Sequence, residues 1–92
     1  MSQGARYAVP SHVVATEAND EAVLLDLDSG DYFRLDEVGK DFWACLSDGL
    51  SHRDCVDQLT EQYDVAPDRL SEDLEKLTQT LVAKGLLEPA EV

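Results

Sequence analysis

The chain has 92 residues, of which 43% are hydrophobic, and its 20 acidic and 7 basic residues give a formal net charge of −13. This length suits one small domain, and no apolar run reaches the roughly 18 residues that a membrane-spanning helix needs. Because proteins bind phosphate backbones through Lys and Arg, so acidic a chain is not expected to bind nucleic acid.

Residues 1–10 show no hydrophobic periodicity, which predicts a flexible N-terminal tail ahead of a folded domain over residues 11–89. The same residues lack the basic segment and the apolar stretch of a secretory signal. We therefore expect a cytoplasmic protein without a membrane partner.

Three short strands are predicted first. Ser11–Glu17 contains two valines and a threonine, and four turn-forming residues follow it. Ala22–Asp36 then holds two apolar runs around a Gly-containing loop, which is typical of a β-hairpin. The three strands predict an antiparallel meander whose third strand, Asp31–Leu35, lies at an edge of the sheet.

The register of the hairpin depends on the length of its loop. A two-residue loop would divide the apolar side chains between the two faces of the sheet. A three-residue loop with Gly30 in the left-handed conformation would instead pair Leu25 with Phe33. It would also pair Val23 with Leu35 and give one uniformly apolar face, so we favour this register.

Helical periodicity begins after the strands. Asp36 is a good N-cap for a helix over Glu37–Ser47, which has apolar residues at helical spacing. Ser51 is the expected N-cap of a second amphipathic helix that ends near Tyr63.

A third helix is predicted over about Asp68–Lys84, with Pro67 at its start and Gly85 as its left-handed C-cap. Its apolar stripe consists of Leu70, Leu74, Leu77, Leu81 and Val82. Three strands followed by three helices predict an α+β fold, related to the winged helix-turn-helix.

The sequence contains no catalytic constellation. Cys45 and Cys55 are not part of a CxxC motif and are expected to pack as small hydrophobic residues. His12 and His52 lie far apart and are expected at the surface. We therefore expect no enzymatic activity, no metal and no cofactor, and we favour a binding module.

Three segments resemble a known family. They are the turn and strand Ser29–Asp36, the cluster Phe42-Trp43-x-x-Leu46, and the closing segment Leu81–Leu87. In this order they resemble the family of small proteins that includes the D protein of pyrroloquinoline quinone synthesis. More broadly, the chain resembles the peptide-recognition elements that act on ribosomally made, modified peptides. The acidic, standalone form is most similar to the recognition protein of lasso-peptide gene clusters, while a peptide chaperone of pyrroloquinoline quinone synthesis is the alternative.

The resemblance implies a function and a site. A leader peptide would add as a fourth strand beside the third strand and lie against the third helix, and residues 11–89 would be the peptide-recognition domain. The partners would be this precursor leader and a leader peptidase or other modifying enzyme. The implied site residues are Asp31, Tyr32, Phe33, Arg34, Leu35, Asp73, Leu74, Leu77, Thr78 and Leu81. Thr78 stands where the family more often has a large apolar residue.

Two other functions fit the same architecture. A winged-helix DNA-binding regulator would need basic residues on its recognition helix, yet the second helix offers only Arg53 against three acids. An enzyme subunit that serves only to dock a larger catalyst is the third possibility, and loss of peptide binding with retained enzyme binding would separate it from the first.

Overall fold

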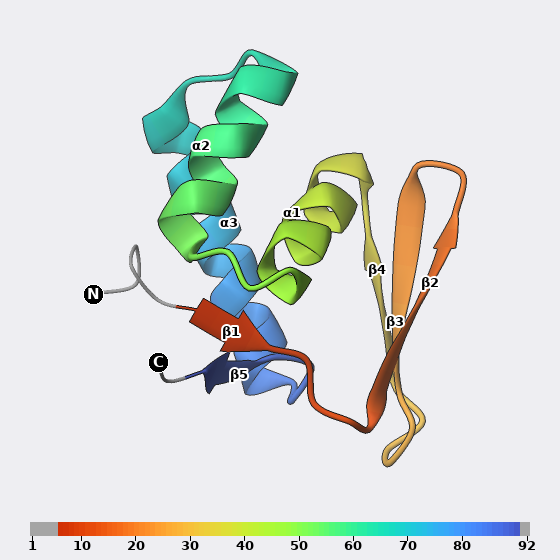
Figure 1. Ribbon diagram of the computed structural model, residues 1–92. Coiled ribbons are helices and arrows are strands. Elements are labelled where there is room, and N and C mark those ends of the chain that lie inside the picture. Colours follow the sequence, from red (N-terminus) through yellow and green to blue (C-terminus); the bar gives the residue numbers. More distant parts are fainter. Residues whose placement is uncertain (1–5, 91–92) are drawn as a thin grey trace.

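The computed structural model describes residues 6–90 and has the α+β architecture that the sequence predicts (Figure 1). Its elements in chain order are β1 (Arg6–Ala8), β2 (Val13–Ala18), β3 (Glu21–Asp26), β4 (Tyr32–Leu35), α1 (Glu37–Ser47), α2 (His52–Tyr63), α3 (Pro67–Ala83) and β5 (Glu88–Ala90). The antiparallel sheet has the strand order β2-β3-β4, as predicted for the meander.

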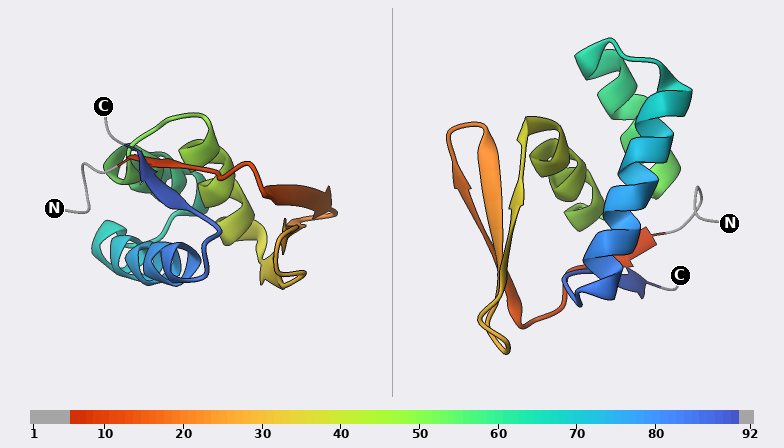
Figure 2. Two further views of the ribbon diagram at one scale, coloured as in Figure 1. Left: turned by 90° about the horizontal axis from the view of Figure 1, so that it is seen from below. Right: turned by 180° about the vertical axis from the view of Figure 1, so that it is seen from behind.

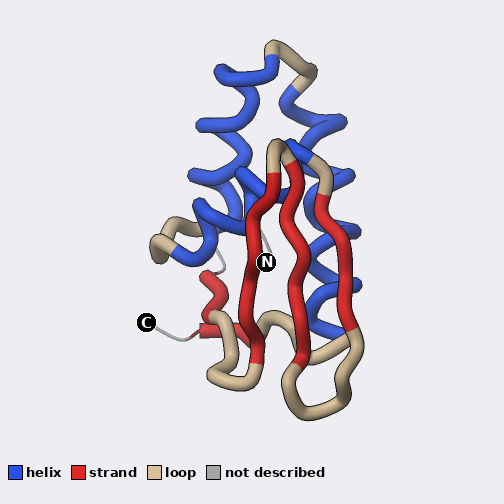
Figure 3. The backbone as a smooth tube through the Cα atoms, turned by 90° about the vertical axis from the view of Figure 1, so that its right-hand side faces the viewer, coloured by secondary structure: helices blue, strands red, loops and turns tan. Residues whose placement is uncertain are grey.

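The core lies between this sheet and the helices. Helix α1 lies between the sheet on one side and α2 and α3 on the other (Figures 1 and 2). The large apolar side chains that are fully buried in the core come from both layers and are Leu24, Phe42, Leu46, Leu59 and Leu81. No helix within residues 6–90 covers the opposite face of the sheet (Figure 3).

The helices begin and end where the capping residues predict. The Asp36 carboxylate accepts the backbone N–H of Gly39 at 2.8 Å, and the Ser51 hydroxyl accepts that of Asp54 at 3.2 Å. Each bond satisfies a donor that a helix N-terminus leaves unpaired. The predicted left-handed conformation of Gly85 is confirmed, with φ of +74°.

The predicted register of the hairpin is wrong by one residue. Leu25 pairs with Tyr32 instead of Phe33, and the partner of Val23 is Arg34. A slip of one residue exchanges the two faces of a strand. The buried face of β3 therefore carries the residues that the prediction had assigned to the opposite face.

The cause is the Asp26 side chain. Its carboxylate accepts the backbone N–H groups of Asp28 at 2.9 Å and Ser29 at 3.2 Å, which lengthens the loop to the four residues 27–30. Asp26 is thereby turned inward with Ala22 and Leu24, and all three side chains are buried.

The predicted flexible tail also needs correction. Within it, β1 pairs antiparallel with β5, so that the two ends of the described chain lie side by side (Figure 2). Residues 1–5 of the predicted tail lie outside the described residues. The pairing contains only three residues from each strand, and neither segment has the alternation that identifies longer strands.

The prediction of surface histidines is wrong for His52. His52 is fully buried, and its ring contacts that of Phe42 edge to face with 5.4 Å between the centroids. Burial lowers the pKa of His52 below its usual value, because removal from water disfavours the charged form. His12 is half-buried. Cys45 and Cys55 are buried free thiols, as predicted.

Candidate functional site

A groove of about 520 Å³ runs between the edge strand β4 and helix α3. Its apolar lining consists of Phe33, Leu35, Val38, Val65, Leu70, Leu74 and Leu77. Charged groups border it, with Arg34 on the strand and Asp73 on the helix. The groove therefore combines an apolar floor with polar groups of both signs.

The backbone of β4 offers unpaired hydrogen-bonding groups beside this groove. The N–H of Asp26 donates to the carbonyl of Asp31 at 2.9 Å, so these opposite residues at the loop end of the β3–β4 ladder form a hydrogen-bonded pair. Because bonded and non-bonded pairs alternate in an antiparallel ladder, Phe33 and Leu35 bond to β3. The backbone groups of Tyr32 and Arg34 then point to the free edge.

The sheet has a second free edge at β2, but its surroundings differ. From Val14 to Ala18 every residue of β2 is exposed, so a chain beside this strand would cover little apolar surface. Beside β4, the half-buried Phe33 and the apolar side of α3 are already in place. The two edges are thus equal in hydrogen bonding and unequal in apolar contact.

Six of the ten residues that the resemblance implied line this groove. They are Phe33, Arg34, Leu35, Asp73, Leu74 and Leu77. Asp31 and Tyr32 instead line a smaller pocket of about 100 Å³ at the start of β4, together with Lys84 at the end of α3.

The other two residues lie elsewhere. Leu81 is fully buried in the core. Thr78 is also buried, and its hydroxyl donates to the carbonyl of Leu74 at 2.8 Å. It borders a separate cavity of about 310 Å³ with Tyr7 of β1. Thr78 and Leu81 therefore belong to the inner sides of α3.

Five groove residues were missing from the sequence-based set: Asp36 and Gly39 at the start of α1, and the apolar residues Val38, Val65 and Leu70. Leu70 could have been included, since it lies one helical turn before Leu74 on the same stripe. Val38 was on the predicted apolar stripe of the first helix, and Val65 lies in the connection between α2 and α3, so neither was expected beside the third strand. Only the packing of these segments places them beside β4.

Among the charged groups of the groove, Arg34 and Asp73 differ in their partners. The Arg34 guanidinium donates to the Glu21 carboxylate at 2.7 Å, and this pair raises the pKa of Arg34. Asp73 is exposed, and within the described chain no hydrogen bond or ion pair engages its carboxylate. Asp73 is thus an available acceptor at the rim of the groove.

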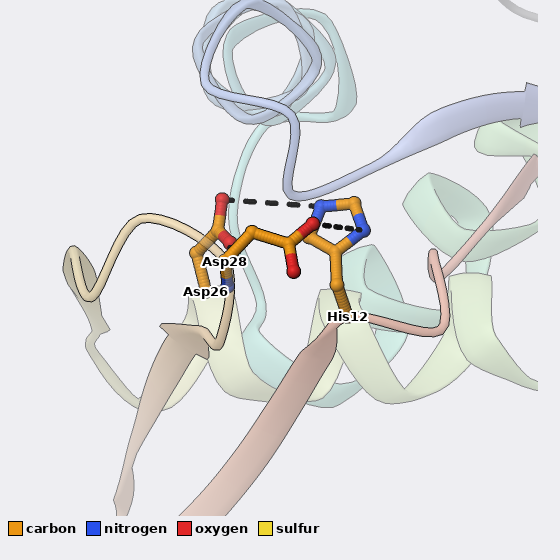
Figure 4. A group of neighbouring side chains, drawn as sticks. All are labelled: His12, Asp26 and Asp28. Carbon is orange, nitrogen blue, oxygen red and sulfur yellow. Dashed lines mark hydrogen bonds and ion pairs between the residues drawn. The ribbon is translucent and has the colours of Figure 1, made fainter.

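One group of side chains comes close enough to share a cation. His12 Nε2 lies 3.8 Å from Asp26 Oδ2, and its Nδ1 lies 3.9 Å from Asp28 Oδ2 (Figure 4). The carboxylates face different ring nitrogens, and Nε2 also lies 3.2 Å from the carbonyl of Gly85. His12 therefore links the β3–β4 loop to the backbone that follows α3.

The reactive side chains of the described residues do not lie in the groove. Burial raises the pKa of the Cys55 thiol to about 12, so its nucleophilic thiolate is scarce at neutral pH. Burial likewise raises the pKa of Cys45. What the groove offers is a backbone edge, apolar surface and one free carboxylate, which are groups for binding.

The fold and groove define a small α+β protein with an open sheet edge beside an apolar helix face. The family model for coenzyme PQQ synthesis protein D (PqqD) matches residues 21–87, and the chain belongs to this family. The expectation from the sequence resemblance is thereby confirmed at the level of the family. No curated protein matches the chain.

Two solved structures are similar along nearly their whole length. One is described as TbiB1 in complex with the TbiA(beta) leader peptide, with 34% identity, a TM-score of 0.84 and coverage of 92% of this chain and 99% of that one. The other is lasso peptide synthetase B1 complexed with the leader peptide, with 26% identity, a TM-score of 0.83 and coverage of 91% and 99%. Among the described residues, no helix is long and apolar enough to cross a membrane.

Proposed function

We propose that this protein binds the leader segment of a ribosomally made precursor peptide and presents it to a partner enzyme, as in lasso-peptide biosynthesis. The leader adds as a fourth strand along the free edge of β4, and its apolar side chains enter the groove beside α3. The partner enzyme, a leader peptidase or another modifying enzyme, carries out the chemistry.

The observation that carries this proposal is the apolar groove beside an unpaired strand edge. Strand addition uses main-chain hydrogen bonds for affinity and side-chain pockets for specificity, and this site offers both. The similar structures support it, because both are described as complexes with leader peptides.

The energies indicate how much of the affinity comes from the backbone hydrogen bonds and how much from the groove. Tyr32 and Arg34 offer two N–H and two C=O groups, so an added strand makes about four hydrogen bonds, each with a net value of about 0.5–1.5 kcal/mol. Micromolar affinity requires about 8 kcal/mol beyond the cost of association. Each apolar peptide side chain that fills the groove contributes about 1.5–3 kcal/mol, so the groove must supply a large part of the affinity.

The alternatives find less support. A chaperone of pyrroloquinoline quinone synthesis would use the same groove, and the family description fits it. The lasso-peptide assignment is favoured because one similar structure is described as lasso peptide synthetase B1, and both are described as complexes with a leader peptide. A DNA-binding role would place the acidic surface of α2, with Asp54, Asp57 and Glu61 around Arg53, against phosphates.

The test is calorimetric titration of the protein with a synthetic leader peptide from the precursor gene beside its own gene. We expect binding at about micromolar Kd and no binding of a peptide with the same residues in scrambled order. Incubation with the full precursor should leave the peptide uncleaved until the partner enzyme is added. Absence of leader binding by the folded protein would contradict the proposal.

A further inference from the structure

The uncovered face of the sheet carries an apolar row across all three strands. The register pairs Val14 with Leu25 and Leu25 with Tyr32, so these side chains lie side by side on the same face. Val14 is 41% exposed and Tyr32 69% exposed. No described helix covers this face, which Figure 3 shows in front of the helices.

A broad hollow continues this row toward the β2–β3 turn. It has a volume of about 560 Å³, and the next cross-strand row, Thr16, Val23 and Arg34, lines it. The carboxylate residues Asp20 and Glu21 border it at the turn, and the Glu21 carboxylate is paired with Arg34 at 2.7 Å. Apolar surface and acidic groups are thus arranged side by side on one face.

This face is separate from the peptide groove. Successive side chains of a strand point to opposite faces, so Tyr32 and Arg34 point outward where Phe33 and Leu35 point to the groove and core. The two surfaces share only β4, through its backbone and through Arg34, which lines both the groove and the hollow. A peptide on the β4 edge leaves the outer face of the sheet open.

The charge of the molecule decides which partner fits. A second copy of this chain would bring another net charge of −13 and the same acidic border against the first. Like charges across an interface cost free energy and suppress such pairing. The face instead fits a surface with an apolar centre and a border of Lys and Arg.

We propose that the outer face of the sheet, centred on Val14, Leu25 and Tyr32, is the docking surface for the enzyme that acts on the bound peptide. This inference rests on the proposed leader binding. Because β4 contributes to both surfaces, a peptide paired with its edge lies directly beside the docked enzyme.

The test uses Val14→Glu, which places a carboxylate on the outer face two strands away from the peptide. Gln58→Glu, at an exposed position of α2, is the matched control, because it adds the same group to a helix that lies on the far side of α1 from the sheet (Figure 1). The probes are the synthetic leader peptide and the purified leader-processing enzyme from the same gene cluster. Binding of each probe is measured by calorimetry, with circular dichroism as the check of folding.

We expect Val14→Glu to bind the leader within about twofold of wild type and the enzyme at least about tenfold more weakly, since apolar contacts at an interface centre carry much of its affinity. Gln58→Glu should bind both as wild type does. Added NaCl should weaken the enzyme complex more than the leader complex, because salt screens the acidic border. If Val14→Glu does not fold, the nearly isosteric Val14→Thr provides the same comparison.

Unchanged enzyme affinity in the folded Val14 variant would overturn the docking surface while leaving leader binding intact. Self-association of the wild-type chain in sedimentation experiments that Val14→Glu abolishes would also overturn it, because a second copy would then cover the face. Failure of the leader itself to bind wild type would instead contradict the proposed function.

Discussion

Asp73 is the groove residue whose role can be tested with least effect on the fold. Its carboxylate is exposed and has no partner in the described chain, so Asp73→Ala should change stability by less than about 0.5 kcal/mol. We expect the variant to melt as wild type does and to bind the leader more weakly, because a peptide amide, hydroxyl or cationic group loses an acceptor. Calorimetric titration measures the change in affinity.

Glu72 provides the control for this experiment. It neighbours Asp73 on α3 but lies outside the groove, where it forms an exposed pair with Lys76 at 3.7 Å. Glu72→Ala should leave leader affinity unchanged. Wild-type affinity in Asp73→Ala as well would remove Asp73 from the site and leave only the apolar groove.

His52 makes stability depend on pH. Burial lowers its pKa below the usual 6.5, so the folded state binds a proton less readily than the unfolded state. The stabilisation from the neutral ring is complete above pH 6.5 and is lost as the pH falls through the lowered pKa. We expect the denaturation midpoint to decrease as the pH falls from 6.5 toward 5.

His52→Leu should reduce this decrease, since the variant has no ring to protonate. Denaturant unfolding at several pH values measures the difference from wild type, and carboxylates titrate mostly below this window. An equal pH dependence in both proteins would show that another group is responsible.

At the scale of the elements, strand β4 allows a test that separates its two edges, the edge paired with β3 and the free edge. Proline removes one N–H donor, and edge strands tolerate it. Arg34→Pro removes a donor at the free edge, so it should leave the fold intact and weaken leader binding. Phe33→Pro removes a donor to β3 and should destabilise the protein itself.

Arg34→Ala is the control, because it removes the side chain and keeps the N–H. Circular dichroism and calorimetry on all three variants distinguish unfolding from lost pairing. Equal leader affinity in folded Arg34→Pro and Arg34→Ala would argue against strand addition at this edge.

Helix α3 contributes leucines to both the core and the groove. Leu81 is fully buried, so Leu81→Ala should cost about 2–5 kcal/mol of stability and affect binding only through unfolding. Leu77 is half-buried and lines the groove, so Leu77→Ala should cost less stability and more affinity. Equal losses of affinity in the two folded variants would contradict this division.

Local signals determined which elements could be predicted. The helices follow from capping residues such as Asp36 and Ser51 and from apolar stripes, which depend on neighbours in sequence. The prediction of the strand register failed because the register depends on hydrogen bonds from the loop to the Asp26 side chain. The apolar pattern does not reveal these bonds. The pairing of β1 with β5 was not predicted for a related reason, since the two strands lie at opposite ends of the described chain.

At the scale of the whole molecule, the groove exists only because separate segments meet. The stripe on α3 and the edge strand were visible in the sequence, and the resemblance joined them. Val38 and Val65 complete the groove from two other segments, and the apolar stripe that contains Val38 does not show that it lies beside β4. The same packing buries His52 and excludes Thr78 and Leu81 from the groove.

The central claim is that a leader peptide pairs with β4 and not with β2, and backbone amide hydrogen exchange measures this directly. The N–H of Leu27 donates to the carbonyl of His12 at 2.7 Å, so by alternation the free amides of β2 are those of Ala15 and Glu17. Saturating leader peptide should slow exchange at Tyr32 and Arg34 and leave Ala15 and Glu17 unchanged. Protection at Ala15 and Glu17, or unchanged exchange at Tyr32 and Arg34 with the peptide bound, would contradict the account.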